Sequence, residues 1–159
     1  MSKEVNIKLA KPQTEEEFLE MDRRDEAQIV AELTGELVTE YAYSFESGGR
    51  TVIGLSYAGV KECARQMGGI RVSEPQIRET DEWWIVYCSA EDTKTGLLFW
   101  GGAQQAKYLP DGRPDPFAFP KAISKAQRNA IRQLLPEPII HAVIRKYLES
   151  QGKAMPSQP

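Results

Sequence analysis

The sequence predicts an α+β fold in which an antiparallel β-sheet packs against helices. Apolar residues recur at helical spacing near both ends of the chain and in one short central segment. The intervening segments are rich in aromatic and β-branched residues, which favour strands. Glycine-containing turns join these strands, as is typical of hairpins and meanders. With 159 residues in the chain, we expect one domain over residues 1–149 and a disordered tail over residues 150–159.

The first predicted element is an acidic helix at about residues 14–38. Thr14 and Glu17 have the spacing of a capping box, and two further glutamates lie between them, where carboxylates favour a helix N-terminus. Four apolar residues are expected to form the inner stripe of this helix: Phe18, Met21, Ile29 and Leu33. The surplus of acidic residues indicates that its other face meets water or a basic neighbour.

A hairpin and a second helix follow the acidic helix. Two short strands are predicted at residues 40–45 and 51–55, and the Ser-Gly-Gly turn at 47–49 joins them. Residues 57–67 then place apolar side chains at helical spacing, and two glycines supply a stop after residue 67. The core of the domain is expected to extend from about residue 40 to residue 136.

Three further strands are predicted at residues 70–77, 83–90 and 97–106, which makes a three-stranded meander. The middle strand is apolar on both faces, so we expect it to be central and covered by helices. Residues 108–120 contain four prolines and are predicted to form an irregular loop. Helices are expected at 121–135, a strongly basic segment, and at 139–149.

Charge is segregated along the chain. Residues 1–49 carry a net charge of −7, residues 50–119 carry −1, and residues 120–159 carry +5, although the whole chain carries only −3. An acidic start and a basic end are typical of a protein in which one surface meets a polyanion while another meets water or a basic subunit.

The basic helix gives the strongest functional indication. At about 100° per residue, its four cations fall on one narrow face: Lys121, Lys125, Arg128 and Arg132. No acidic residue occurs between Asp115 and Glu137 to offset their repulsion. A phosphate backbone would offset it, because each cation can replace a condensed counterion. This spacing favours nucleic-acid binding, while a solvated face or a salt bridge to an acidic helix of a neighbour stay open as alternatives.

Side chains at the end of the last strand could extend this surface. Gln104, Gln105, Lys107 and Tyr108 could add hydrogen bonds or a stacking surface beside the basic helix. Ordinary polarity at the end of a strand explains them equally well. We therefore include Lys107 among the candidate DNA-binding residues without assigning it a specific contact.

Three stretches of the chain together resemble the annealing domain of the Rad-fifty-two family of homologous-recombination proteins. The helix at residues 57–69 begins near an aromatic residue and a glycine, carries a basic residue and ends at a glycine. Residues 83–88 and 97–102 resemble the long central strand pair of the family, and residues 125–132 resemble its DNA-binding helix. The resemblance covers about residues 40–136 and is one of pattern and order.

The resemblance implies ATP-independent binding of single-stranded DNA and annealing of complementary strands in recombination and repair. Family members form rings with DNA in an outer basic groove and its bases turned outward. By position, Lys61, Arg128 and Arg132 would be groove residues, supported by Lys121 and Lys125. Asn129 stands where the family often has a second basic residue.

The same resemblance implies that the chain is not an enzyme and needs no cofactor. Its implied partners are single-stranded DNA and other copies of the chain, with an exonuclease or a single-strand-binding protein as further candidates. A compact phage or bacterial version fits best, located in the cytoplasm of a bacterium or infected host. The N-terminus lacks a signal-peptide pattern, and no apolar run has the length of a membrane span.

Several other chemistries find little support in the sequence. No G-x-x-x-x-G-K-[ST] loop is present, which disfavours an ATP-driven recombinase. His141 lies among apolar residues, and the acidic residues near strand ends lack a recognisable metal-binding spacing, so a metal-dependent nuclease is a weaker alternative. A non-annealing interaction module, whose basic helix docks on acidic helices, is the other alternative.

The cysteines and tryptophans are interpreted mainly as packing residues. Cys63 and Cys88 lack the spacing of a metal site and are expected to be buried thiols. Trp83, Trp84 and Trp100 could stack on bases, but packing in the core or at a subunit interface is the favoured role.

Overall fold

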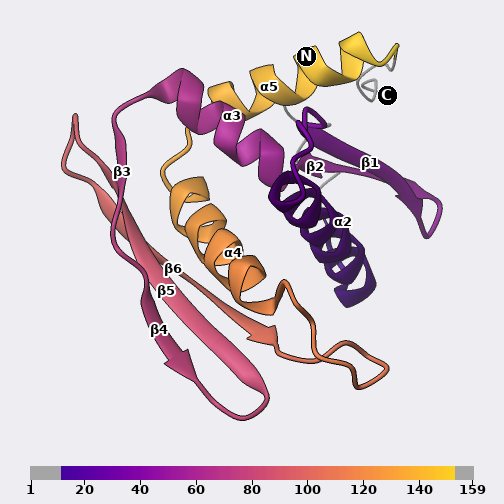
Figure 1. Cartoon of the computed structure of the whole chain (residues 1–159). Helices are drawn as coiled ribbons and strands as arrows, with labels where there is room; N and C mark the ends of the chain where they lie inside the picture. The colour runs from indigo at the N-terminus through magenta and orange to yellow at the C-terminus, as the bar shows by residue number, and fades with distance from the viewer. Residues whose placement is uncertain (1–11, 153–159) are drawn as a thin grey trace. The chain divides into compact units, whose positions relative to one another are not determined.

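The structure, a computed structural model, describes residues 12–152 and divides into two compact units. The first unit contains the described residues up to Gln66 and those from Pro136 onward, and the second is Met67–Leu135. The fold is α+β with antiparallel sheets and, in the described part, four helices, as predicted (Figure 1). The single domain expected over residues 1–149 stays a prediction. Most of the expected tail, residues 153–159, lies outside the described residues.

Helix α2 (Glu15–Leu33) begins as the capping pattern predicts. The backbone N–H of Glu17 donates to Thr14 Oγ1 at 3.2 Å, and the Glu17 carboxylate accepts from the backbone N–H of Gln13 at 2.8 Å. The helix ends earlier than the expected residue 38, because Gly35 adopts a φ of 96° and reverses the chain.

The predicted inner stripe of α2 is wrong at two positions. Ile29 is buried, but Phe18 is 54% exposed and Leu33 is also exposed. The buried side chains of the helix are instead Glu17, Asp25 and Ile29. Polar residues occupy this face because their side chains accept hydrogen bonds from neighbouring backbone N–H groups. The spacing of apolar residues gives no information about such contacts.

Helix α3 (Tyr57–Met67) receives those acceptors at its N-terminus. Asp25 Oδ1 accepts from the backbone N–H of Tyr57 at 2.8 Å, and Gln28 Oε1 accepts from that of Ala58 at 2.9 Å. Ser56 Oγ accepts from the N–H of Gly59 at 3.0 Å. The first turn of α3 thus has its otherwise unpaired N–H groups satisfied by side chains from two segments of the first unit.

A two-stranded antiparallel hairpin and the last helix complete the first unit. Strands β1 (Ala42–Ser47) and β2 (Arg50–Leu55) pair around Gly48 and Gly49, both of which have positive φ. Helix α5 (Glu137–Ser150) starts two residues before the expected position, since a proline is tolerated in the first turn of a helix.

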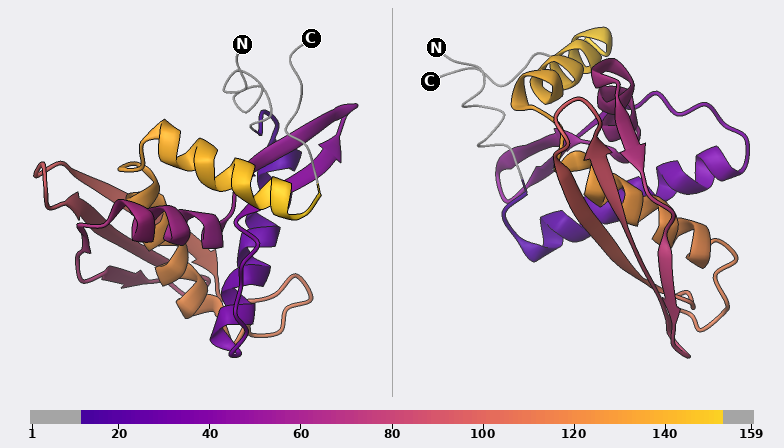
Figure 2. Two further views of the ribbon diagram at one scale, coloured as in Figure 1. Left: turned by 90° about the horizontal axis from the view of Figure 1, so that it is seen from above. Right: turned by 90° about the vertical axis from the view of Figure 1, so that its left-hand side faces the viewer.

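The second unit is built on the long strand β5 (Trp83–Asp92). Strands β3 (Ile70–Val72) and β4 (Gln76–Glu79) pair with one edge of β5, and β6 (Leu98–Ala106) pairs with the other, all antiparallel (Figure 2). The prediction that the strand at residues 83–90 is central is therefore confirmed.

The expected single strand at residues 70–77 is wrong, because it is broken between β3 and β4. Pro75 lies in the break and has no backbone N–H to donate. Opposite the break, the N–H of Ser89 donates to the Ser73 hydroxyl at 2.8 Å, where a regular ladder would use a backbone carbonyl. A side chain therefore replaces a ladder bond at this point.

Helix α4 (Ala118–Arg132) covers one face of the sheet. Its alanines pack on alternate residues of β5 in one buried cluster, whose members are Val86, Cys88, Ala90, Ala122, Ala126, Ala130 and Leu134. The helix starts three residues before the expected position because Pro120 lies in its first turn, where no N–H bond is lost. The other face of β5 is not covered as expected, since Trp83 is 38% exposed.

None of the helices among residues 12–152 combines the length and apolar character needed to cross a membrane.

Candidate nucleic-acid interface

The four cations of α4 lie on one stripe, which faces away from its sheet-packing alanines. Their exposure differs along the stripe. Lys121 and Lys125 are 7% and 6% exposed, whereas Arg128 and Arg132 are half-buried. The predicted residues are therefore brought together on one helix, but the two lysines are not part of an exposed surface.

Lys121 has a carboxylate partner within the second unit. Its Nζ lies 2.7 Å from Asp115 Oδ2, and both side chains are buried. The other Asp115 oxygen accepts from the backbone N–H of Phe117 at 2.9 Å, just before α4 begins. Asp115 thus anchors the proline-rich loop to the start of α4, a role that the sequence pattern did not reveal.

Arg128 is oriented by its neighbour Asn129. Arg128 Nε donates to Asn129 Oδ1 at 3.0 Å, and Asn129 Nδ2 donates to the carbonyl of Gly102 at 2.9 Å. One turn later, Gln133 Nε2 donates to the carbonyl of Trp100 at 2.7 Å. Asn129 on α4 and Gln133, the residue that follows this helix, therefore satisfy carbonyls of the edge strand β6, so Asn129 has a structural role.

Lys107 is held against the sheet just after β6. Its Nζ forms an ion pair with Glu79 and lies 5.0 Å from the centroid of the Trp84 ring. Trp84 also packs on Phe119 of α4, with ring centroids 4.7 Å apart. Trp84 is therefore a packing residue, as favoured, and Lys107 shares the second unit with the α4 stripe.

Lys61 belongs to the first unit, on α3. Its Nζ forms a hydrogen bond of 3.0 Å with Glu32 Oε1 and lies 5.3 Å from the centroid of the Tyr57 ring. Burial disfavours the charged ammonium, but the Glu32 and Tyr57 contacts outweigh this effect and raise the pKa of Lys61. The side chain therefore stays cationic across the physiological range.

The uncovered face of the sheet carries residues that were not among the predicted site. Trp100 is 51% exposed, and its ring lies beside that of Tyr87, with centroids 6.2 Å apart. Arg78 on β4 is exposed on the same face, because it pairs in register with Ile85, an outward-facing residue of β5. The alternation of inward and outward residues along β5 and β6 was the signal that could have separated Trp100 from Trp84.

The thiols and the histidine are buried. Cys63 and Cys88 form no disulfide, which confirms the prediction, and burial raises the pKa of the Cys88 thiol. His141 Nε2 lies 3.3 Å from a Glu137 carboxylate oxygen, an ion-pair distance without hydrogen-bond geometry. Within the described part of the chain, no three His, Cys, Asp or Glu residues are grouped closely enough to hold a metal ion.

Comparison with known proteins adds one relative. No protein-family model matches the chain. An uncharacterized protein of Methanocaldococcus jannaschii is 29% identical over 104 residues, which is 65% of this chain and 43% of that protein. The chain thus spans less than half the length of this curated relative, whose name assigns it no function.

Proposed function

We propose that this protein binds single-stranded DNA through Arg128 and Arg132 of α4 and anneals complementary strands without ATP. The observation that carries the proposal is the pair Arg128 and Arg132, one turn apart on the side of α4 that faces away from the sheet. In the annealing hypothesis, these arginines bind the phosphate backbone, and the bases stay accessible for pairing with a second strand.

The chemistry of the two arginines supports phosphate binding. Each guanidinium can donate two parallel hydrogen bonds to phosphate oxygens. Arg128 is already oriented by Asn129, which lowers the entropy lost when it binds. Arg132 is half-buried, and no hydrogen bond or ion pair of its side chain occurs among residues 12–152.

The order of the elements also supports the proposal. A hairpin, a helix, an antiparallel sheet and a basic helix follow one another as the resemblance to the Rad-fifty-two family implies. Contacts to phosphates carry no sequence information, which suits a protein that must anneal any complementary pair. We extend the proposal to a ring of several copies, in recombination or repair, on the strength of that resemblance alone.

The test uses Arg128→Ala combined with Arg132→Ala. Removing two phosphate contacts should flatten the slope of log affinity against log salt by about one to two units. The same variant should anneal two complementary fluorescent oligonucleotides more slowly than the wild type, in buffer without nucleotide or divalent metal. Fluorescence anisotropy with an oligonucleotide at several salt concentrations measures the slope.

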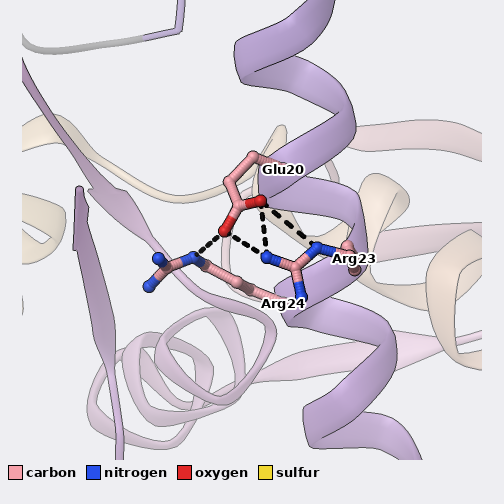
Figure 3. Close-up of polar contacts among 3 residues, drawn as sticks. All are labelled: Glu20, Arg23 and Arg24. Atoms are coloured by element: carbon pink, nitrogen blue, oxygen red, sulfur yellow. Dashed lines mark hydrogen bonds and ion pairs between the residues drawn. The ribbon is translucent and has the colours of Figure 1, made fainter. Parts of the chain in front are cut away.

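A matched control removes two arginines from other helices. Arg23 forms an ion pair with Glu20 on α2 (Figure 3), Arg65 forms one with Glu62 on α3, and both are exposed. Arg23→Ala with Arg65→Ala changes the net charge by the same amount, so it should leave the slope unchanged. An unaltered slope in the α4 variant, or an equal change in both variants, would remove the α4 assignment.

A second candidate is a non-annealing interaction module whose basic helix docks on acidic helices. The contact between Lys121 and Asp115 favours it, because one stripe lysine already takes a carboxylate partner. Under this reading, the wild type should bind DNA poorly and its oligomers should become smaller in high salt, since surface ion pairs are screened. Sedimentation velocity at low and high salt distinguishes this candidate from annealing.

A further inference from the structure

The face of the sheet opposite α4 is open and carries aromatic rings. Along β5, residues 84, 86, 88 and 90 point toward α4, so the alternate residues Ile85 and Tyr87, both partly exposed, point to the open face, while Ser89 on the same side is buried. The register of β6 places Trp100, Gly102 and Gln104 on the same side. The exposed ring of Trp100 therefore lies on a surface that no element of the second unit covers.

Neither steric contact nor backbone conformation in the described residues requires a glycine at position 102. Its neighbour Gly101 must be one, because an added Cβ would lie 2.2 Å from the backbone nitrogen of Ala130. At Gly102 an added Cβ would make only ordinary contacts, 3.5 Å from the Val86 carbonyl oxygen and 3.6 Å from Tyr87 Cβ, and φ is not positive. A glycine inside a strand costs stability and often marks close approach of a ligand.

The surroundings of Gly102 fit a flat ligand. Gly102 pairs directly with Tyr87 across the sheet, and Trp100 precedes it by two residues on the same face. Because Gly102 has no side chain, its backbone is exposed between these two rings, whose planes are inclined at 58°. A planar group can lie over the glycine and contact the face of an aromatic ring.

The charges on this face favour an anionic ligand. Its outward-facing charged residues are Arg71, Arg78 and Glu91, of which Arg71 and Glu91 face each other 3.7 Å apart. Within the described part of the chain, Arg78 forms no ion pair, so it is the unpaired cation of this face. A planar group that carries a negative charge nearby is the chemistry of a nucleotide in a single strand.

We infer that the open sheet face stacks an unpaired base of a single strand on Trp100 and Tyr87 above Gly102, with Arg78 facing its phosphate. This inference rests on the proposed function, since the arginines of α4 hold the same strand. Asn129 connects the two sites, because it contacts both Arg128 and the backbone carbonyl of Gly102 at the β6 edge. The protein thus reads the presence of bases as well as phosphates.

The test compares an oligothymidylate with an abasic oligonucleotide of equal phosphate number. The wild-type protein should bind the oligothymidylate about tenfold or more tightly at the same salt concentration, which corresponds to stacking of one base. Trp100→Ala should remove most of this preference while leaving the salt slope unchanged. Trp100→Phe should retain it, because a phenyl ring still stacks.

Two further variants complete the design. Gly102→Val places a side chain over the exposed backbone and should also remove the preference for oligothymidylate. Phe18→Ala, which deletes an exposed ring on α2, should leave that preference unchanged. Far-UV circular dichroism establishes that each variant is folded. If Gly102→Val fails to fold, the comparison of Trp100→Ala with Trp100→Phe decides the result.

The failure of this inference is distinguishable from failure of the proposed function. Equal binding of both oligonucleotides by the wild type overturns the stacking site, even if the arginine variant flattens the salt slope. If Trp100→Ala loses the preference for oligothymidylate, the stacking site is supported. If the arginine variant at the same time keeps the wild-type salt slope, the α4 assignment is overturned. If Trp100→Ala alters oligomer size in sedimentation velocity but keeps the base preference, the face is a contact between copies and the inference is overturned.

Discussion

Adjacent glycines on β6 differ in what their missing side chains do. The missing side chain of Gly101 lets α4 approach β6 closely, because any Cβ there would collide with the helix backbone at Ala130. Gly102 meets no such constraint and turns toward the open face. Strand periodicity alone places the two on opposite faces, but only the packing of α4 shows that just one of them is sterically required.

The two glycines provide a matched pair of stability variants. Gly101→Ala should lower the free energy of unfolding by about 3 kcal/mol, since α4 must shift away from the sheet. Gly102→Ala should raise it by about 0.5–1 kcal/mol, because alanine loses less conformational freedom in a strand. Urea denaturation followed by circular dichroism measures both. Similar losses in the two variants would contradict the close approach at Gly101.

Burial of individual lysines was beyond the reach of the sequence pattern. The periodicity placed Lys121 and Lys125 on the same helical stripe as the arginines, and the structure agrees with that placement. Their exposure depends on contacts that spacing does not encode, such as the carboxylate of Asp115 six residues before Lys121. Residue type and spacing thus predicted the stripe but not which of its members stay accessible.

At the scale of elements, the N-terminus of α2 combines a cap with an ion pair. The Glu17 carboxylate accepts from the backbone N–H of Gln13 and contacts Arg50 of the hairpin. The hydrogen bond from Gln13, reinforced by Arg50, holds the pKa of Glu17 below its usual range. Glu17 thus connects α2 to β2 through a charged side chain.

The lowered pKa of Glu17 predicts a pH dependence of stability. Because the folded pKa is below the unfolded value, the contribution is fully present above the ordinary glutamate pKa of about 4.3 and is lost as pH falls through the folded pKa. Glu17→Gln should therefore be less stable than the wild type near neutral pH, with the difference shrinking in acid. Glu16→Gln, at an exposed neighbour, is the control, and thermal unfolding from pH 7 to pH 3 measures both.

Elements with strong local signals were predictable. The capping pattern at Thr14 and the paired glycines of the hairpin fix backbone conformation within a few residues, and both occur where expected. The break in the strand at residues 70–77 also had a local signal, Pro75, which the expected strand did not take into account. The hydrogen bond from Ser89 to the Ser73 hydroxyl, sixteen residues away, was not predictable, because local propensity does not specify long-range partners.

At the scale of the whole molecule, the segregation of charge was visible in the sequence, whereas the division into two compact units was not. The second unit interrupts the first in the chain, since the first resumes at Pro136. An inserted unit of this kind leaves no periodicity or composition signal. The core expected over about residues 40–136 extends across the unit boundary after Gln66 and, like the single domain, stays a prediction.

One buried thiol in each unit allows the stability of the units to be compared. Cys63 lies in the first unit, and Cys88 lies in the second, directly opposite Gly101 in the sheet register. In a Cys63→Ser background, Gly101→Ala should accelerate labelling of Cys88 by a thiol reagent, because opening of the sheet exposes it. In a Cys88→Ser background, the same change should have a smaller effect on Cys63. Equal acceleration would mean that the two units open only together.

Because each unit contains one buried cysteine, the alkylation rates of the two native thiols report on the two units separately. A DNA strand bound to the second unit should stabilise that unit against local unfolding. Alkylation of Cys88 should then become slower relative to alkylation of Cys63. Mass spectrometry of peptides containing each cysteine reads the two rates from one sample. Under the proposed function, the two labelling rates would show which unit a bound DNA strand protects, and no added label is needed.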